Sequence, residues 1–346
     1  METNGSNSTC VLHEHDDYKF DVYAVVYSLV FVIGLILNLI ALFEFVRLTP
    51  RRTVTTIYLI NLAISDLCFV ILLPLRIYYY TTHNWIFGDV LCRITYSMFY
   101  VNMYCSIFFL TGLSVFRYLA IVHPIRSRNS TTSRRAIISC ATIWLFVVMI
   151  SSPFLKLGEY QLNNATRCFE ADGKDELHIM LILNYLAVIV GLFLPFVTIV
   201  FCYVSIVKVL RRRKKHLAIC QSTLRMIASI LVVFAICFIP YHIQRTLYVH
   251  ISSDYPNDCE LQLTMQKGVV ATVSFAAFNS CLDPFIYFFA SEKFRNRFFD
   301  VLHKLNLRRS KTPATDPHDV RYRDTQVHEN SLPVLDQSNS REEFQG

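Results

Sequence analysis

Charge is scarce in this sequence. Asp, Glu, Lys and Arg make up 17% of the 346 residues, whereas a soluble domain carries about 25%. Hydrophobic residues make up 53%. This balance excludes a disordered chain, a collagen and a coiled coil, and it argues against an ordinary cytosolic enzyme. The composition therefore predicts an integral membrane protein.

Motifs of catalysis and of nucleic-acid binding are also missing. The sequence has no zinc-protease spacing, phosphate-binding loop or serine nucleophile elbow, so we do not expect an enzyme. It has no zinc spacing, helix-turn-helix signal or base-stacking motif, so we expect no nucleic-acid partner. The net charge of +7 has another explanation, because the basic residues lie in short clusters between long apolar runs.

Long apolar runs dominate the chain. A helix needs about 20 apolar residues to cross a bilayer, and helices and closed barrels alone satisfy their backbone hydrogen bonds in lipid. A barrel would show alternating strands of about ten residues, and a transporter would show repeated halves; we find neither. We predict an all-α membrane protein, a seven-transmembrane helix bundle with a short amphipathic cytoplasmic helix. Its spans cover roughly residues 22–46, 56–80, 91–122, 136–154, 178–209, 223–250 and 267–290.

Basic and acidic residues mark opposite sides of the membrane. Clusters around Arg51, Arg126 and Arg211 follow alternate spans, whereas Asp17 and Asp254 lie in the other loops. Because Lys and Arg stay in the cytoplasm, the N-terminus is predicted outside and the C-terminus inside. The predicted parts are an extracellular N-terminus (1–21), the transmembrane domain (22–290), an amphipathic helix on the membrane lipids (291–307) and a disordered cytoplasmic tail (308–346).

Sequons and cysteines agree with this orientation. Glycosylation sequons begin at Asn4, Asn7 and Asn164, all on the predicted outer side. The outer cysteines are Cys10, Cys92, Cys168 and Cys259. An even number in an oxidising compartment predicts two disulfides. We favour Cys92–Cys168 and Cys10–Cys259, although three pairings of four cysteines remain open.

Polar residues within spans are costly and point to function. Two carboxylates, Asp66 and Asp283, fall within spans, and Asn38, Ser106 and Asn279 lie at similar depth. Carboxylate and amide oxygens suit a hard cation, so a structural sodium ion is one interpretation. The alternative is a hydrogen-bond network without an ion. We expect no other cofactor.

Several motifs together resemble the rhodopsin-like G-protein-coupled receptors over about residues 20–305. They are Leu62-Ala63-Ile64-Ser65-Asp66, Arg117 at the end of the third span, Pro195 and Tyr203 in the fifth, Cys237-Phe238-Ile239-Pro240 in the sixth and Asp283-Pro284-Phe285-Ile286-Tyr287 in the seventh. The resemblance implies a plasma-membrane receptor that signals through a heterotrimeric G protein. It assigns the G-protein switch to Arg117, Tyr203, Pro240 and Tyr287, and it implies receptor kinases and arrestin as partners of the tail.

The sequence departs from the pattern of that family at three positions. Phe116 replaces the acidic residue that usually precedes the arginine, so the ion pair that holds the resting state is not expected. Phe238 replaces the usual tryptophan of the sixth span, and Asp283 replaces the usual asparagine of the seventh. The last variant is typical of receptors for nucleotides and lipid mediators.

Tyrosines and cations gather in the outer halves of the spans. They are Tyr27, Arg76, Tyr100, Tyr104, Tyr241, His242, Arg245 and Lys267. Arginine pairs with carboxylate and phosphate, and tyrosine adds hydrogen bonds and ring contacts. The pattern predicts an anionic ligand, with two open classes: an acidic lipid, or a nucleotide or other small polyanionic carboxylate.

Short stretches of the sequence favour the acidic lipid over the nucleotide as the ligand. Pro240-Tyr241-His242-Ile243-Gln244-Arg245-Thr246 and Arg167-Cys168-Phe169-Glu170 are similar to the cysteinyl leukotriene receptors, type 1 especially. The resemblance implies a ligand with a peptide-derived carboxylate head and a fatty-acid tail, and Gq-type coupling to calcium. By the same resemblance the tail would lie near Leu183, Ala187 and Val190.

Overall fold

The computed structural model describes residues 17–48, 53–125, 127, 132–156, 158–162, 165–169, 181–212, 217–255 and 258–290. The chain divides into two compact units, 1–296 and 297–346, and the described residues all belong to the first. The predicted sequons at Asn4, Asn7 and Asn164, the cysteine Cys10, the amphipathic helix 291–307 and the tail 308–346 lie outside the described residues.

Seven helical segments among the described residues are long and apolar enough to cross a membrane. The prediction of seven spans is confirmed. The spans are Tyr18–Arg47, Val54–Thr82, Asp89–Val122, Ser133–Lys156, Leu181–Arg211, Gln221–Asp254 and Cys259–Tyr287.

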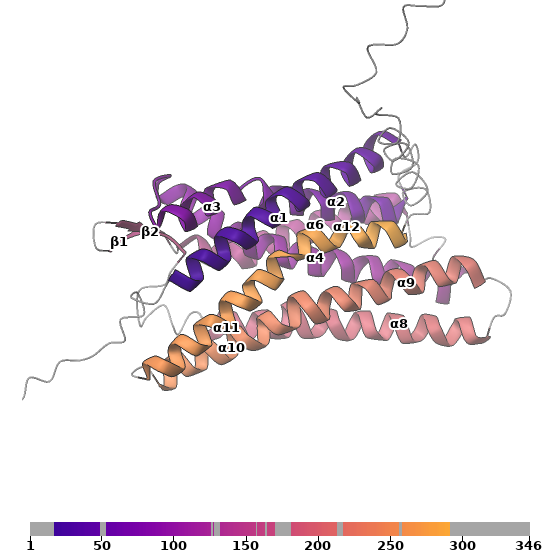
Figure 1. Ribbon diagram of the computed structural model, residues 1–346. Helices are drawn as coiled ribbons and strands as arrows, with labels where there is room; N and C mark the ends of the chain where they lie inside the picture. The colour runs from indigo at the N-terminus through magenta and orange to yellow at the C-terminus, as the bar shows by residue number, and fades with distance from the viewer. Residues whose placement is uncertain are drawn as a thin grey trace, which may run out of the picture. The chain divides into compact units, whose positions relative to one another are not determined.

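The helices run side by side as a bundle, with a small two-stranded sheet at one end (Figure 1). The elements are α1 (Asp17–Phe43), η2 (Glu44–Leu48), α2 (Val54–Val70), α3 (Leu73–Thr82), α4 (Asp89–Val122), α6 (Ser133–Ser151), η3 (Ser152–Lys156), β1 (Tyr160–Leu162), β2 (Ala165–Arg167), η4 (Ala187–Phe193), α8 (Leu194–Arg212), α9 (Leu217–Val233), η5 (Phe234–Phe238), α10 (Ile239–Asp254), α11 (Cys259–Ala277) and α12 (Asn279–Ala290). The long helix α4 packs against α2, α6 and α8 and is the centre of the bundle. We call the end that carries β1 and β2 the hairpin end.

Prolines explain where the long spans change direction. Pro74 lies in the first turn of α3, directly after α2 ends at Val70. Pro240 lies in the first turn of α10, after the π-helical turn η5. Proline has no N–H to donate and its ring crowds the preceding turn, so it begins a helix more easily than it continues one. Each proline therefore divides one span into two helices.

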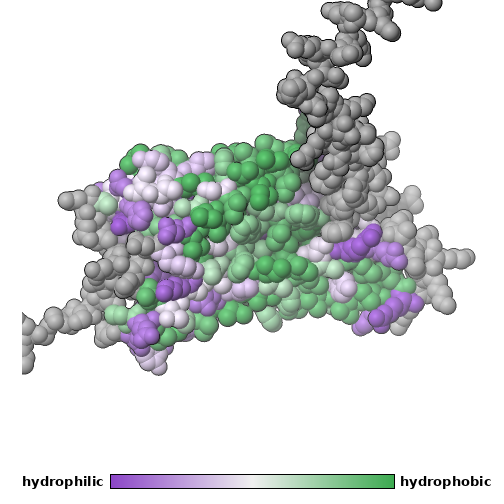
Figure 2. Space-filling model, in the orientation of Figure 1, coloured by the Kyte–Doolittle hydropathy of each residue, from purple (hydrophilic) through white to green (hydrophobic). Residues whose placement is uncertain are grey.

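The outside of the bundle is apolar. Large hydrophobic side chains such as Val25, Leu29, Phe43, Ile137 and Phe201 are exposed on the spans. Figure 2 shows a broad hydrophobic band along the helices, with hydrophilic residues gathered toward the two ends. A soluble protein rarely exposes so large an apolar surface. The band is the surface expected to face lipid.

Two span starts differ most from the predicted bounds. The first helix begins at Asp17, earlier than residue 22, because Phe20 is 1% exposed and its ring stacks on His83 at 4.1 Å. The seventh span begins at Cys259, earlier than residue 267. Its first turn is capped by Asp258, whose side chain accepts from the Leu261 amide at 3.1 Å. Hydropathy missed both turns because polar residues dominate them.

Candidate functional site

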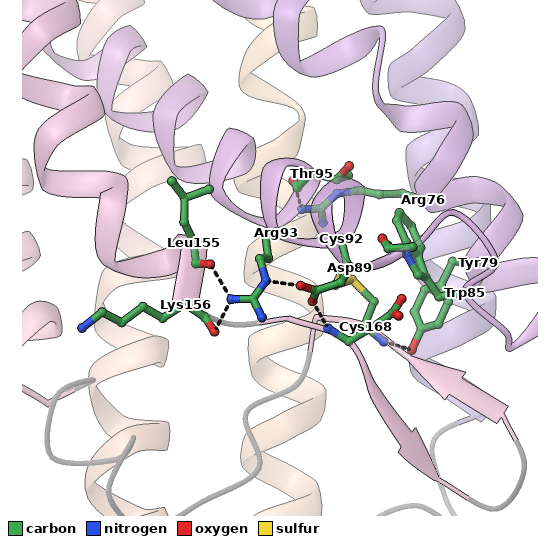
Figure 3. The surroundings of a disulfide bond; sticks show 12 residues. Arg76, Tyr79, Trp85, Asp89, Cys92, Arg93, Thr95, Leu155, Lys156 and Cys168 are labelled. Carbon is green, nitrogen blue, oxygen red and sulfur yellow. Dashed lines mark hydrogen bonds and ion pairs between the residues drawn. A yellow bond between two sulfur atoms is a disulfide. The ribbon is translucent and has the colours of Figure 1, made fainter.

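A disulfide bond and the hairpin β1–β2 lie together at the hairpin end. Cys92, near the start of α4, is bonded to Cys168, as predicted, and their Cα atoms lie 6.0 Å apart. The Trp85 amide donates to the Thr166 carbonyl at 2.9 Å, and the Cys168 amide donates to the Tyr79 hydroxyl at 3.5 Å. Figure 3 shows Tyr79 and Trp85 beside the bond between Cys92 and Cys168. The sheet is thereby fixed against α3 and α4.

Cys259 is also disulfide-bonded. Its predicted partner, Cys10, lies outside the described residues. The pairing of these two cysteines stays a prediction.

Arg76 lies at the centre of the predicted ligand-binding residues. It is buried, and its guanidinium donates to the Thr95 carbonyl at 2.7 Å and to the Tyr27 hydroxyl at 3.4 Å. The guanidinium carbon lies 4.4 Å from the centre of the Phe169 ring, and Figure 3 shows it pointing toward α4. The Nε atom has no hydrogen-bond partner. A buried arginine with an open donor suits an incoming anion.

Aromatic rings connect Arg76 to the second predicted arginine: the Arg76 guanidinium carbon lies 5.9 Å from the centre of the Phe99 ring, which lies 5.3 Å from that of Tyr100. The Tyr96 and Tyr100 hydroxyls are 3.3 Å apart. The Tyr100 ring stacks on Phe154, with centres 3.8 Å apart and planes 6° apart. The charge of Arg245 interacts with the hydroxyls of Tyr96, Tyr100 and Tyr241. The structure therefore brings residues from α4, η3 and α10 into one polar, aromatic surface.

Tyr104 ends this polar surface. Its hydroxyl is 3.4 Å from the His242 Nε2 atom. His242 is buried, and its Nδ1 atom lies 2.9 Å from the Phe238 carbonyl oxygen. Because that carbonyl can only accept, Nδ1 carries the proton and Nε2 accepts from the tyrosine. Both predicted residues are therefore fixed in orientation.

An apolar cavity begins on the other side of Tyr104. Its volume is about 170 Å³, and it is lined by Tyr104, Phe146, Ile150, Phe154, Leu183, Leu186, Ala187, Val190 and Gly191. Leu183, Ala187 and Val190, near which the tail is predicted to lie, are all in its wall. Gly191 lets η4 approach α4 closely, because a Cβ there would lie 2.6 Å from the Tyr104 ring.

Lys267 is the predicted binding residue that the structure leaves apart. It is exposed on α11, and none of the contacts described above includes it. The sequence interpretation in turn missed Phe154, Phe169 and Tyr96. Phe169 has a left-handed backbone, with φ of 73°. Its position directly after a disulfide cysteine was the one available signal.

Two of the predicted switch residues, Arg117 and Tyr287, lie away from the hairpin end. Arg117 is half-buried near the end of α4, and its Nε has no hydrogen-bond partner. The preceding Phe116 packs on Tyr58, with ring centres 5.3 Å apart, where an acidic residue would pair with the arginine. Tyr287 is fully buried beside Phe45, and its hydroxyl also lacks a partner.

Pro240 and Tyr203 lie on separate helices. Pro240 follows η5, whose π-helical turn spans Phe234–Phe238 and loosens the helix before the proline. Tyr203 is half-buried on α8. The structure places Pro240 where a hinge would be needed, between α9 and the polar surface around Arg245.

A polar network crosses the middle of the bundle. Asn102 donates to Asp66 at 2.9 Å, and Ser280 donates to Asn102 at 3.2 Å. Asn38 donates to the Ser280 carbonyl at 2.8 Å. All four residues are buried. The network joins α1, α2, α4 and α12.

The second carboxylate of the network is less well satisfied. Both Asp283 oxygens and one Asp66 oxygen have no hydrogen-bond partner, although both residues are fully buried. Asn279 and Ser106, also predicted here, hydrogen-bond to each other at 3.0 Å. Open carboxylate oxygens are what a hard cation binds, so the residues present fit sodium.

Known proteins match this chain along most of its length. The seven-transmembrane receptor domain of the rhodopsin family matches residues 37–287. Cysteinyl leukotriene receptor 1 of Mus musculus is 41% identical over 303 residues, 86% of each chain. Cysteinyl leukotriene receptor 2 of Sus scrofa is 38% identical over 314 residues, 88% of this chain and 87% of that receptor. Lysophosphatidic acid receptor 6 of Homo sapiens is 39% identical over 293 residues, 82% of this chain and 84% of that receptor. The chain therefore belongs to the rhodopsin family of seven-transmembrane receptors, which are multi-pass plasma-membrane proteins and not enzymes.

Proposed function

We propose that this receptor binds an anionic lipid, specifically a cysteinyl leukotriene, on its extracellular side and signals through a Gq-type G protein to calcium. One observation carries the proposal. The arginine and tyrosine surface around Arg76 and Arg245 meets the apolar cavity at Tyr104 and Phe154, which belong to both. A ligand with an acidic head and a long apolar tail would fill both parts.

The head would lie between the two arginines. Arg76 has an open donor at Nε, and Arg245 already interacts with tyrosine hydroxyls that are poorer acceptors than a carboxylate. A carboxylate replaces these neutral partners with charge-assisted hydrogen bonds. Tyr100 and Tyr241, between the arginines, would add donors.

The tail would enter the apolar cavity. Its wall offers Leu183, Leu186, Ala187 and Val190 from the fifth span and Phe146 from the fourth. Burying an alkyl chain stabilises a complex by about 0.8 kcal/mol per CH₂. A nucleotide, the alternative ligand, supplies the anion but no chain for this cavity.

The names of the relatives support an acidic lipid. Two are called cysteinyl leukotriene receptors and one a lysophosphatidic acid receptor. The head groups named differ, whereas an acidic group on a lipid is common to them. We choose the leukotriene because receptors of both of its types match this chain.

Ligand binding would act on α10 through Arg245. The ligand draws Arg76 and Arg245 together, α10 turns at Pro240, and the cytoplasmic end of α9 near Arg225 moves outward. Arg117 and Tyr287 then face a cleft for the G protein. A ligand shifts such an equilibrium only by its different affinities for the two states. A bound G protein must in turn raise the affinity for agonist.

A sodium ion would oppose this movement. Asp66 and Asp283 would hold it, with Asn38, Ser106 and Asn279 near by, and its charge would offset the repulsion between two buried carboxylates. Receptor kinases and arrestin would act on the serines and threonines of the tail, which lies outside the described residues.

The test is intracellular calcium in cells that express the receptor at the surface. Cysteinyl leukotrienes, lysophosphatidic acid and a nucleotide panel are applied separately to the wild type, to Arg245→Ala and to Lys156→Ala. Lys156 is an exposed cation on η3 and is the matched control. We expect a calcium response to leukotriene. Arg245→Ala should reduce the potency of the leukotriene by about 10-fold or more, because it removes a hydrogen bond to a charged group, and Lys156→Ala should leave the potency unchanged. A response to nucleotides alone would reject the lipid.

A further inference from the structure

We propose a second anion-binding subsite at Arg167, on strand β2, which binds an additional acidic group of the ligand. The proposal rests on the function proposed above. It assigns the ligand at least two acidic groups: one held between Arg76 and Arg245, and one held by Arg167. It therefore concerns a preference for a diacid lipid over a monoacid lipid.

The backbone on both sides of Arg167 is fixed. Arg167 pairs with Tyr160 in the hairpin. Before it, the Thr166 amide donates to the Asn84 side chain at 2.9 Å, and the Thr166 carbonyl accepts from Trp85 at 2.9 Å. After it, Cys168 is held by the disulfide. A cation presented by a fixed strand loses little freedom when it binds an anion.

The guanidinium of Arg167 has donors to spare. Its Nε and Nη1 atoms are buried and have no hydrogen-bond partner. Its carbon atom lies 5.3 Å from the centre of the Phe20 ring, so one face is packed on an aromatic side chain. Arginine stays charged in proteins, and an unsatisfied buried donor on a charged group is costly. An anion that accepts from both nitrogens would remove that cost.

A second cation raises the positive potential at the same place. The Lys19 nitrogen also lies 5.3 Å from the centre of the Phe20 ring. His83 stacks on this ring at 4.1 Å. An anion beside this ring is attracted by both positive charges. The surroundings of Arg167 therefore select for negative charge.

The subsite is separate from Arg76 but continuous with it. From Arg167 the contacts run through Phe20 to Tyr80, with ring centres 5.6 Å apart, and from Tyr80 to Tyr27 at 5.7 Å. The Tyr27 ring is 5.6 Å from the Arg76 guanidinium carbon. A row of three rings thus separates the two arginines. The three rings are buried, so a ligand that binds both arginines must carry acidic groups that stand apart.

Competition binding on receptor membranes tests the subsite. The probes are a cysteinyl leukotriene with both its fatty-acid and its peptide carboxylate, and the same compound with the peptide carboxylate converted to an amide. We expect Arg167→Ala to weaken the diacid by about 10-fold or more and the amide by less than about 2-fold. Arg167→Lys should retain part of the preference for the diacid, because lysine keeps the positive charge but cannot donate two parallel hydrogen bonds as a guanidinium does.

The control variant is Gln161→Ala, on the partner strand, which removes the hydrogen bond from Gln161 to the Thr166 hydroxyl. It should leave both affinities unchanged. Equal losses for the diacid and the amide in Arg167→Ala and in Arg167→Gln would show that Arg167 only supports the hairpin, and would overturn the subsite. Unchanged affinities would overturn it as well. A wild type that binds neither probe would reject the proposed function itself.

Discussion

At the scale of single residues, the absence of a side chain at Gly191 shapes the proposed binding site. Gly191 lies in the π-helical turn η4 and lines the apolar cavity beside Tyr104. The ring of Tyr104 occupies the space that a Cβ would need, only 2.6 Å away. The cavity and the hydrogen bond from Tyr104 to His242 both depend on this close approach.

Gly191→Ala is therefore expected to move the Tyr104 ring and to reduce the cavity. We expect affinity for a leukotriene with a full-length tail to fall by about 10-fold, with a smaller loss for an analogue with a shortened tail. Competition binding on membranes measures both. Gly34→Ala is the control, because its Cβ would meet Val70 at 3.1 Å and Cys281 and Ser280 at 3.8 Å, and Gly34 does not line the cavity. Equal losses for both tail lengths would contradict this role of Gly191.

At the scale of elements, Arg93 ties η3 to α4. Its guanidinium donates to Asp89 at 2.6 Å and to the carbonyls of Leu155 and Lys156, both at 2.9 Å. Figure 3 shows the guanidinium between the carboxylate and the two carbonyls. The ion pair is partly exposed and by itself contributes little. The carbonyl contacts, however, fix the segment that carries Phe154, which stacks on Tyr100.

Gly158 completes this connection, because a Cβ there would collide with the Asp89 carboxylate and the Arg93 guanidinium. We expect Gly158→Ala and Arg93→Ala each to destabilise the receptor by about 1 kcal/mol. In the double variant the second change should add little, since both break the same contacts. Thermal unfolding of the purified wild type, both single variants and the double variant measures this double-mutant cycle. Fully additive losses would mean that the two residues act independently.

The sequence predicts elements well where hydropathy alone decides them. All seven spans followed from apolar runs, because lipid requires each run to form its own hydrogen bonds. The hairpin β1–β2 did not follow, since it depends on contacts with Trp85 and Asn84 from another segment. The same holds for the first turn of α11, where Asp258 acts as a cap within a polar stretch.

The residues of the proposed binding site divide in a similar way. Arg76, Tyr100 and Arg245 were predictable because a buried cation or a row of tyrosines within a span is unusual. Phe154 and Arg167 were not predictable, because nothing in their local sequence indicates that Phe154 packs on Tyr100 and Arg167 on Phe20. Their positions depend on where η3 and β2 are held against the bundle.

At the scale of the whole molecule, the polar network around Asp66 and Asp283 connects helices from both ends of the chain. If sodium binds there in the resting state, replacing sodium by choline at constant ionic strength should raise agonist affinity by about 5-fold or more. Asp66→Asn should remove this dependence, whereas Glu44→Gln, at another buried acid, should preserve it. Agonist binding on membranes is the measurement. Equal affinities in both salts would leave a hydrogen-bond network without an ion.

The aromatic packing of the hairpin end also gives the receptor an optical probe of its own. The chain has two tryptophans. Trp144 donates to Asn61 at 3.0 Å, between α6 and α2. Trp85 is 2% exposed and lies 5.4 Å from the Phe169 ring, which Arg76 covers. With Trp144 replaced by phenylalanine, the remaining indole emission would come from a fluorophore one ring away from the ligand's anchoring charge, so occupancy could be followed without any attached dye.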